Sequence, residues 1–427
     1  MAIEQSAADL LATAVRGVLG VGELPVRLRA WDGSVAGPEG TPVVAVHSRR
    51  ALRRLVWAPG ELGLGRAYVA GELEIEGDVF ATLSALTSAG RLASRDAPTG
   101  LPLRERLAVV GAAARLGALG PEPAPPPEEV RLHRAGRRHS RRRDAAAIAH
   151  HYDVGNDFYA LVLGPSMVYS CAVWESPATR LDAAQEAKLD LVCRKLGLRS
   201  GARLLDVGCG WGGLALHAAQ RYGARVVGIT LSTAQAELAR RRGAAAGLAD
   251  RVEIRVQDYR DVADGPYDAI ASIGMAEHVG AAGMAGYVRT LHDLLRPGGR
   301  LLHHAIAENA VAPRRNPDSF ITRFVFPDGE LLGLARTLSA LEGGGLEVLD
   351  VEALRRHYAL TLRAWVERLE KNWDAAVALA GPGRARVWRL YMAASALSFE
   401  AGKMGVNQVL VQRPGGDPPP LRRRDWV

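Results

Sequence analysis

The most constraining feature of this chain is a glycine-rich stretch at residues 203–213, with the sequence RLLDVGCGWGG. Residues 203–207 have the short apolar run of a buried parallel strand. The glycines that follow allow the backbone to turn sharply and to approach a ligand closely. Residues from 214 onward have a helical pattern, so the stretch predicts a strand, a tight turn and a helix N-terminus. This combination is typical of a nucleotide-type pocket at the carboxyl edge of a doubly wound sheet.

The glycine spacing alone does not identify the nucleotide. Gly208, Gly210 and Gly213 satisfy the G-x-G-x-x-G pattern of dinucleotide sites. An NAD site also needs an acidic residue about twenty residues further on, at the end of the second strand. The strand predicted at residues 225–229 is followed by TLS, which contains no acidic residue. The sequence DVGCGWGG, which begins at Asp206, instead resembles the first motif of methyltransferases that use S-adenosyl-L-methionine (SAM). SAM is therefore favoured over NAD as the ligand.

Length and composition predict two domains and a sizeable core. The chain has 427 residues, of which 48% are hydrophobic. We expect a small α+β domain at residues 1–118, a Pro/Arg-rich linker at 119–144, an α/β domain at 145–413 and a tail at 414–427. In the first domain a helix is expected at 6–20, strands at 26–30 and 43–46, and a loop followed by a helix at 61–86. The apolar stripe of the first helix fits either a membrane surface or packing within the domain.

The α/β domain is expected to alternate helices and strands. A helix is predicted at 181–196, and strands are predicted at 203–207, 225–229, 252–256, 267–273 and 300–306. Helical stretches near 363–379 and 384–399 are interpreted as a cover over the substrate site.

No apolar run approaches the length of about 18 residues that a membrane span requires, and the first residues lack the pattern of an export signal. A cytoplasmic protein is therefore expected. The three cysteines, Cys171, Cys193 and Cys209, form neither a disulfide framework nor a paired metal-ligand pattern, so no structural metal is predicted.

The charge balance favours an anionic partner, either nucleic acid or a phospholipid surface. The formal net charge is +8, from 54 basic and 46 acidic side chains. Seven arginines lie between residues 131 and 143, directly after a proline-rich run. This segment fits a polybasic membrane contact or a solvated hinge, and the sequence does not choose between the two.

A set of motifs then identifies a family. HYDVGNDFY, YSCAVW, LDVGCGWGGLA, GITLSTAQ, VQDYRD, GMAEHVG, LLHHAI, FVFPDGELL and HYALTLRAW occur in the order seen in the cyclopropane fatty acid synthase family, over residues 145–411. GLGRAYVAGELE resembles, more loosely, the smaller lipid-binding domain of two-domain bacterial members. The resemblance implies a Rossmann-like class I methyltransferase fold with a small N-terminal α+β lipid-binding domain. It also implies methylation of the cis double bond of unsaturated acyl chains in membrane phospholipids, with SAM as the methyl donor.

The same resemblance implies two sites. A bound bicarbonate serves as the base, and its site maps to Cys171, Glu277, His304, Ile306 and Tyr358. Thiol, imidazole, phenol and backbone N–H groups can donate to a small anion, and a carboxylate can accept from its hydroxyl. Cofactor-binding positions map to Tyr169, Ser170, Asp206, Gly208, Gly210, Thr230, Leu231, Gln235, Asp258 and Tyr259. His303 is expected on the opposite strand face from His304 and is given no role.

Methylation of an alkene leaves a carbocation, which aromatic faces can stabilise. Candidates for such a slot, or for ordinary core positions, are Tyr152, Phe158, Tyr169, Trp174 and Tyr358.

Several alternatives remain. Loss of a proton from the added methyl carbon closes a cyclopropane ring, whereas a hydride shift before proton loss gives a 10-methylene chain, the precursor of a 10-methyl branch. A nucleic-acid methyltransferase is disfavoured because residues 272–278, SIGMAEH, lack the [DNS]-P-P-[YFW] signature of amino-group methylation. A lipid-binding module with an inactive methyltransferase fold is disfavoured by the intact site positions. The expected partner is an unsaturated phospholipid in an anionic membrane surface, at the inner face of the cell membrane. The family also implies a second copy of the chain, as a homodimer. No nucleic-acid partner is expected.

Overall fold

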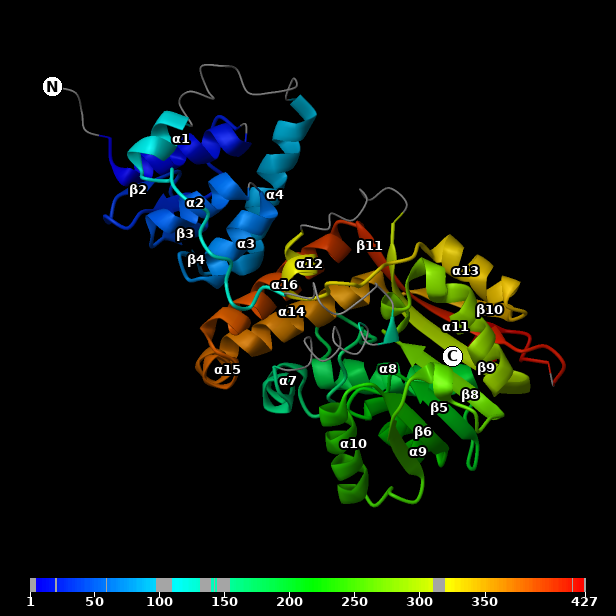
Figure 1. Cartoon of the computed structure of the whole chain (residues 1–427). Helices are drawn as coiled ribbons and strands as arrows, with labels where there is room; N and C mark the ends of the chain where they lie inside the picture. The colour runs from blue at the N-terminus through cyan, green and yellow to red at the C-terminus, as the bar shows by residue number, and fades with distance from the viewer. Residues whose placement is uncertain are drawn as a thin grey trace. The chain divides into compact units, whose positions relative to one another are not determined.

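The computed structural model describes residues 5–19, 21–58, 60–96, 110–130, 140–141, 143, 154–309, 319–416 and 418–425. The chain divides into two compact units (Figure 1). The first unit comprises residues 1–130, 315–325 and 380–397, and the second comprises 131–314, 326–379 and 398–427.

The first unit is built around a four-stranded sheet in the order β2-β1-β3-β4. Its elements are α1 (Ala7–Leu19), β1 (Arg27–Arg29), β2 (Val35–Ala36), β3 (Val43–Val46), α2 (Arg49–Trp57), α3 (Glu61–Val69), β4 (Leu73–Glu76), α4 (Val79–Asp96) and α12 (Phe320–Phe324). Leu10, Leu11 and Ala14 of α1 are buried, so packing accounts for its apolar stripe. The loop and helix predicted at 61–86 are wrong in detail, because α3, β4 and the start of α4 occupy this segment.

Ion pairs tie later parts of the chain to the first unit. Arg66 forms a bidentate ion pair with Glu129, with N–O distances of 2.7 and 2.8 Å. This ion pair fixes the end of the proline-rich run. Helix α16 (Pro382–Glu400) contributes Arg386, which pairs with Glu74 at 2.9 Å, and Arg389, which donates to the Tyr68 hydroxyl at 2.9 Å. These contacts explain why residues 380–397, which the sequence analysis placed in the α/β domain, belong to the first unit.

The second unit is organised by a seven-stranded sheet in the order β10-β11-β9-β8-β5-β6-β7. Five strands are parallel: β5 (Arg203–Val207), β6 (Arg225–Thr230), β7 (Val252–Val256), β8 (Tyr267–Ile273) and β9 (Leu295–Glu308). Strand β11 (Met404–Gln412) is antiparallel to β9, and β10 (Glu347–Ala353) is antiparallel to β11. The α/β sheet predicted from the sequence is confirmed, including the bounds of β5, β7 and β8. The sequence analysis missed β10 and β11, which complete the sheet.

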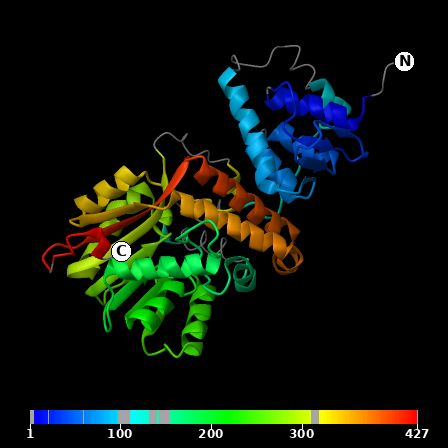
Figure 2. The same cartoon turned by 180° about the vertical axis from the view of Figure 1, so that it is seen from behind.

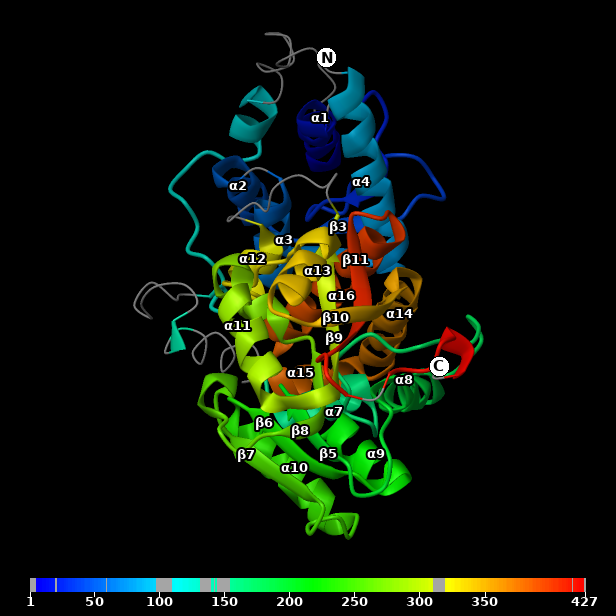
Figure 3. The ribbon, with the colours of Figure 1, turned by 90° about the vertical axis from the view of Figure 1, so that its right-hand side faces the viewer.

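Helices cover both faces of this sheet. On one side, α8 (Leu181–Leu196), α9 (Gly213–Tyr222) and α10 (Thr233–Ala245) pack against alternate strand residues such as Leu204 and Leu302 (Figure 2). On the other side, α11 (Gly280–Leu294) and α13 (Leu334–Gly343) pack against residues such as Leu205 and Leu301. Figure 3 shows α11 on one side of the sheet and α8 and α9 on the other.

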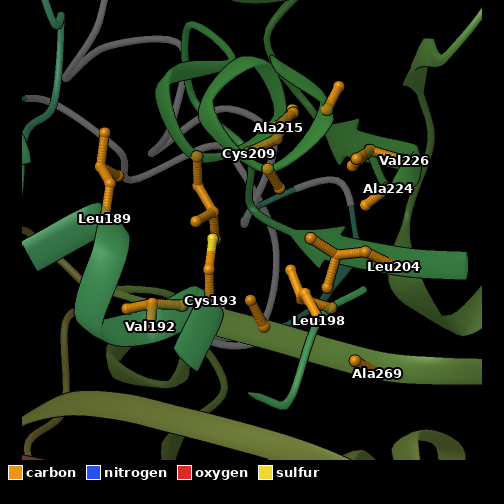
Figure 4. Close-up of a cluster of buried hydrophobic side chains, with 14 of the residues drawn as sticks. Leu189, Val192, Cys193, Leu198, Leu204, Cys209, Ala215, Ala224, Val226 and Ala269 are labelled. Atoms are coloured by element: carbon orange, nitrogen blue, oxygen red, sulfur yellow. The ribbon is translucent and has the colours of Figure 1, made fainter. Parts of the chain in front are cut away.

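Figure 4 shows part of the first of these cores, with Leu189, Val192 and Cys193 of α8 opposite Leu204 of β5. The helix predicted at 181–196 is confirmed. The remaining elements are α7 (Asn156–Leu163), α14 (Arg355–Lys371), α15 (Trp373–Ala380) and three short 3-10 helices, η1 (Tyr259–Asp261), η2 (Ala276–His278) and η3 (Arg423–Asp425).

The order of connections reverses between β5 and β8, because β6 and β7 lie on one side of β5 while β8 and β9 lie on the other. Open α/β sheets bind ligands in the crevice at this switch point, outside the carboxyl ends of the strands. The glycine-rich turn follows β5 directly and therefore lies at this crevice.

Candidate active site

The turn after β5 has the backbone geometry that its glycines permit. Gly208 and Gly210 have φ values of +81° and +54°, a region that side chains disfavour. The N–H groups of Gly208 and Cys209 both donate to the carbonyl of Ile229, at 3.0 and 2.9 Å, which fixes the turn against the end of β6. Helix α9 begins just beyond the turn, so its N-terminus faces the crevice.

A cavity of about 550 Å³ opens at this edge. All ten cofactor-binding positions expected from the sequence line it: Tyr169, Ser170, Asp206, Gly208, Gly210, Thr230, Leu231, Gln235, Asp258 and Tyr259. Its size lies in the range of small-molecule sites. The structure thus brings together residues that come from the ends of several strands.

Two parts of the wall are fixed by their own hydrogen bonds. Thr230 donates through its hydroxyl to the Gln235 side chain at 2.8 Å, and Ser232 caps α10. Asp258 accepts from the guanidinium of Arg260 at 2.6 and 2.8 Å, and this contact holds its pKa below the usual range against the effect of burial. Tyr259 lies beside Asp258 with the Arg260 guanidinium 5.4 Å from its ring centre. These contacts within the protein fix the position of both groups.

The floor of the cavity carries two buried charged side chains. Asp206, at the end of β5, has an Oδ2 atom that is buried and has no hydrogen-bond partner among the described residues. Burial raises the pKa of Asp206 to about 7, and nearby Lys188 acts in the opposite direction. Lys188 lines the same cavity from α8, and burial lowers its pKa to about 8. The sequence analysis missed Lys188, although a lysine on the apolar stripe of a helix is a detectable signal.

Trp211 is a second cavity residue that the sequence analysis missed. Its indole N–H donates to the Asn156 side chain at 2.7 Å, and its ring packs against Tyr159 at 4.6 Å between centres. This contact joins α7 to the glycine-rich turn. Asn156 and Tyr159 lie within the HYDVGNDFY motif, so the pairing explains why that motif accompanies the turn.

The expected base-site residues come from four separate segments. Glu277 lies on η2, and its Oε1 accepts from the backbone N–H of Ile306 on β9 at 2.8 Å. Its Oε2 is buried without a hydrogen-bond partner among the described residues. Burial raises the pKa of Glu277 to about 7. This carboxyl group can therefore be neutral or charged near neutral pH.

His304 presents a second unsatisfied atom. It lies two residues before Ile306 on β9, so both side chains lie on the same strand face. Its Nδ1 is buried and has no hydrogen-bond partner among the described residues, and burial keeps the pKa of this imidazole well below its usual range. The Nδ1 atom of His303 lies 3.3 Å from the hydroxyl oxygen of Tyr287. Tyr287 belongs to the core between the sheet and helices α11 and α13. This position agrees with the opposite face expected for it.

Cys171 lies near the start of α14, which carries Tyr358. The Cys171 thiol lies 3.7 Å from the carbonyl of Leu354, which also accepts the backbone N–H of Tyr358 at 3.0 Å. Burial raises the pKa of the Cys171 thiol well above its usual value, so the group remains a protonated donor and not a nucleophilic thiolate. None of the five base-site residues lines the 550 Å³ cavity, although Cys171 directly follows Ser170, which does.

An aromatic chain extends from the cavity toward this region. The ring of Tyr169 lies 5.3 Å from that of Trp365, which in turn lies 6.1 Å from that of Tyr358. Trp365 is fully buried and was not among the sequence candidates, although it ends the HYALTLRAW motif. Phe158 and Trp174 are also buried, with the Trp174 indole donating to Thr361 at 3.0 Å. Tyr152 lies outside the described residues.

Among the described residues, no group of three or more His, Cys, Asp or Glu side chains could hold a metal ion. In the same described part of the chain, no helix is long and apolar enough to cross a membrane.

Residues 139–409 match the family model described as mycolic acid cyclopropane synthetase. Three named relatives are similar over long stretches. A probable fatty acid methyltransferase of Mycobacterium tuberculosis is 43% identical over 94% of this chain and 95% of its own. A tuberculostearic acid methyltransferase of the same organism is 35% identical over 92% and 88%. The cyclopropane-fatty-acyl-phospholipid synthase of Escherichia coli is 38% identical over 62% and 66%.

Solved structures show the same fold. A mycolic acid cyclopropane synthase in complex with S-adenosylhomocysteine (SAH) and CTAB aligns with a TM-score of 0.59 and 34% identity, over 63% of this chain and 98% of its own. The agreement confirms the predicted class I methyltransferase fold, and the lining of the cavity, with the unpartnered Asp206 oxygen at its floor, fits SAM. This chain is therefore a SAM-dependent methyltransferase that belongs to the cyclopropane and methyl-branched fatty acid synthase family.

Proposed function

We propose that this enzyme transfers the methyl group of SAM to the cis double bond of unsaturated acyl chains in membrane phospholipids, and that bound bicarbonate accepts the proton that is released. The observation that carries the base assignment is that two buried atoms, Glu277 Oε2 and His304 Nδ1, have no hydrogen-bond partner among the residues that the structure describes. Buried polar atoms without partners are rare in folded proteins and call for an explanation. A small ligand with both donor and acceptor atoms provides one.

The charge states of the base-site residues support an anion ligand. Neutral His304 and the protonated thiol of Cys171 can donate hydrogen bonds without carrying charge. Glu277, with a pKa near 7, can accept from the hydroxyl of bicarbonate or pass a proton. The second role of this site is electrostatic, since an anion near the reacting carbons stabilises the carbocation.

Ile306 takes a modified role in this proposal. Its backbone N–H already donates to Glu277 Oε1, so it fixes the orientation of the carboxylate. We infer that Ile306 positions Glu277, and that the other four residues contact the anion.

Aromatic side chains supply the remaining stabilisation. Tyr169 lines the cofactor cavity, and Trp365 connects its ring to that of Tyr358 at the base site. Aromatic faces attract a cation through their quadrupole, and they cannot quench a carbocation as a nucleophile such as a thiolate would. We place the acyl double bond along this aromatic chain.

The proposed product is a cyclopropane ring, as named for the family model and the E. coli relative. A 10-methylene chain is the second candidate, and the match to a tuberculostearic acid methyltransferase over 92% of this chain favours it. Both products share the methyl transfer and the base, and in both the added methyl carbon loses the proton. They differ in whether a hydride shift first moves the cation onto the carbon that carries the methyl group.

We further propose that the enzyme works as a homodimer bound peripherally to the anionic inner face of the cell membrane. The net charge of +8 and the arginines at 131–143 support this location, since each basic residue near an anionic surface contributes about 1 kcal/mol. Arg141 and Arg143 pair with Asp261 and Asp328, at 2.8 and 2.6 Å, so the membrane contact is assigned to the other arginines of the segment.

The test is incubation with methyl-labelled SAM and oleoyl phospholipid vesicles, followed by proton NMR of the recovered lipid. Upfield ring-methylene signals are expected. Olefinic methylene signals in their place would establish the second candidate. Absence of label from the acyl chains would contradict both.

A further inference from the structure

Helix α2 has one side that the packing of the first unit does not use. Its residues Ala51, Leu52 and Arg54 are buried in the unit. The opposite side spans about one third of the helix circumference and is called the α2 face, which consists of Arg49, Arg50, Arg53, Val56 and Trp57. Val56 and Trp57 are 49% and 51% exposed.

The segment at 117–120 extends this surface. The Trp57 indole N–H donates to the carbonyl of Gly120 at 2.9 Å, and the Arg53 guanidinium donates to that of Gly117 at 3.0 Å. Leu119 lies between these two contacts in the chain and is 54% exposed. It therefore adds a third exposed apolar side chain next to the arginines.

The α2 face carries positive charge that the described residues leave largely unbalanced. The helix sequence, RRALRRLVW, contains no acidic residue. No carboxylate of a described residue lies within ion-pair distance of Arg49 or Arg53. Glu72 lies 3.7 Å from Arg50, but it is already bound by the buried Arg54 at 2.8 Å. The surface therefore suits an anionic partner.

Arginine content alone does not single out the α2 face, because α10 contains three consecutive arginines. On α10, Arg240 donates to the carbonyl of Ile254 at 2.7 Å. Arg242 donates to the carbonyls of Trp211 and Ser166, at 2.6 and 3.1 Å. These arginines support the second unit itself, and α10 has no large hydrophobic side chain among the exposed described residues. Only a group of exposed apolar side chains rimmed by polar ones marks an interaction site.

We propose that the α2 face docks the enzyme on an anionic phospholipid bilayer, with its arginines at the phosphates and Val56, Trp57 and Leu119 in the interface. Tryptophan is favoured at the membrane–water interface, and helices that combine basic and apolar side chains bind in its plane. A nucleic acid would match the charge but not the aliphatic side chains. The inference rests on the phospholipid substrate proposed above, and it adds a second basic contact to that of the 131–143 segment.

The first test places a polarity-sensitive fluorophore on the α2 face of the full-length chain. Val56→Cys is labelled at its thiol, and wild type treated in the same way gives the background from the three native cysteines, which are buried. With phosphatidylglycerol vesicles the emission should shift to the blue and be quenched by nitroxide-bearing lipid. Unchanged emission of protein that sediments with the vesicles would overturn the proposal, because another surface would then dock. Failure to sediment would overturn it as well.

The second test separates this surface from net charge. Arg49→Gln combined with Arg50→Gln should lower partitioning into the same vesicles about tenfold or more at low salt. The matched control is Arg199→Gln combined with Arg225→Gln, which removes the same charge from exposed positions near the amino ends of β5 and β6. The control should change partitioning by less than about twofold. Equal losses in both variants would overturn the proposal.

Two further measurements define the partner and separate docking from catalysis. A DNA duplex that displaces the enzyme from vesicles at equal phosphate concentration would overturn the bilayer assignment in favour of a nucleic acid. With oleoyl phospholipid dispersed in neutral detergent, the Arg49→Gln and Arg50→Gln variant should keep turnover within about twofold of the wild-type value. Loss of that turnover in the variant alone would overturn a pure docking role. Absence of turnover in the wild type would instead contradict the proposed function, since fluorescence and partitioning involve no methyl transfer.

Discussion

The cofactor cavity and the base site differ in how the chain builds them. Half of the cavity lining comes from the strand ends and turns between Asp206 and Tyr259, and polar groups of this wall bond to one another, as in the Thr230–Gln235 and Asp258–Arg260 pairs. The base site draws on residues from 171 to 358, and Glu277 Oε2 and His304 Nδ1 have no hydrogen-bond partner in the part of the chain that the structure describes. The cavity wall is thus largely held by bonds within the protein, apart from the Asp206 carboxylate, whereas we propose that a ligand completes the base site. The two regions should consequently respond differently to substitution.

Glu277→Gln should give the largest separation between the two regions. In the proposed mechanism it removes the carboxylate that assists bicarbonate in taking up the proton, and such a role commonly contributes a factor of about 10²–10⁴ in rate. Because Glu277 does not line the cofactor cavity, SAH affinity should stay within about twofold. Turnover is measured with labelled SAM and phospholipid vesicles, and SAH affinity by calorimetry. Near-normal turnover would remove Glu277 from the mechanism.

Asp206→Asn should weaken SAH binding, which Glu277→Gln should leave nearly unchanged. It keeps the shape of the cavity floor but removes the negative charge that faces the cofactor, so SAH affinity should fall about tenfold or more. Methylthioadenosine, which has no ammonium group, should bind as before. Equal weakening of both ligands would show that Asp206 supports the turn after β5 and does not contact the cofactor.

The free energy of unfolding should depend on pH differently in the wild type and in Glu277→Gln. The folded-state pKa of about 7 lies above the ordinary value of 4.5, so Glu277 contributes stability that is fully present below pH 4.5 and lost as the pH rises through 7. The shift corresponds to a loss on the order of 2 to 3 kcal/mol. Urea unfolding of the wild type at pH 5 and pH 7.5 should show this loss relative to Glu277→Gln. Parallel profiles for the two proteins would mean that Glu277 is well solvated.

Replacement of other arginines in the 131–143 segment should give the smallest effect, and it is not expected to change cofactor binding. Replacing Arg137, Arg138 and Arg142 by Gln leaves the ion pairs of Arg141 and Arg143 intact. Sedimentation with anionic vesicles should weaken several-fold at low salt, and the difference should shrink at high salt because screening removes it. SAH affinity is the control and should not change. Vesicle binding equal to that of the wild type would favour the hinge interpretation.

The contrast between the two regions also explains what the sequence could predict. The strand, turn and helix at 203–213 are neighbours in the chain, so residue pattern and glycine placement were sufficient to locate β5 and the cavity. The residues of the base site were identified only through a family resemblance, because nothing local connects Cys171 to Tyr358. Their meeting depends on the long-range packing of α14 and on the register of β9.

The sequence pattern did not predict the contacts of three residues. Lys188 lies in the helix predicted at 181–196 but was not singled out, since the helical pattern does not say what faces a buried lysine. Trp365 lay within a recognised motif but outside the aromatic candidates, because Tyr169, which links it to the cavity, is distant in sequence. Arg389 lay in a helix interpreted as a substrate cover, yet its contacts with Tyr68 and the backbone of β4 draw that helix to the first unit.

The most direct test of the central claim is the dependence of turnover on bicarbonate. Turnover is measured in buffer purged of carbon dioxide and then titrated with bicarbonate, with SAH affinity followed in parallel. If the buried group around Glu277 and His304 is completed by this anion, turnover should fall when it is removed and recover on titration, while SAH affinity stays constant. Turnover that is unchanged in purged buffer would contradict the account.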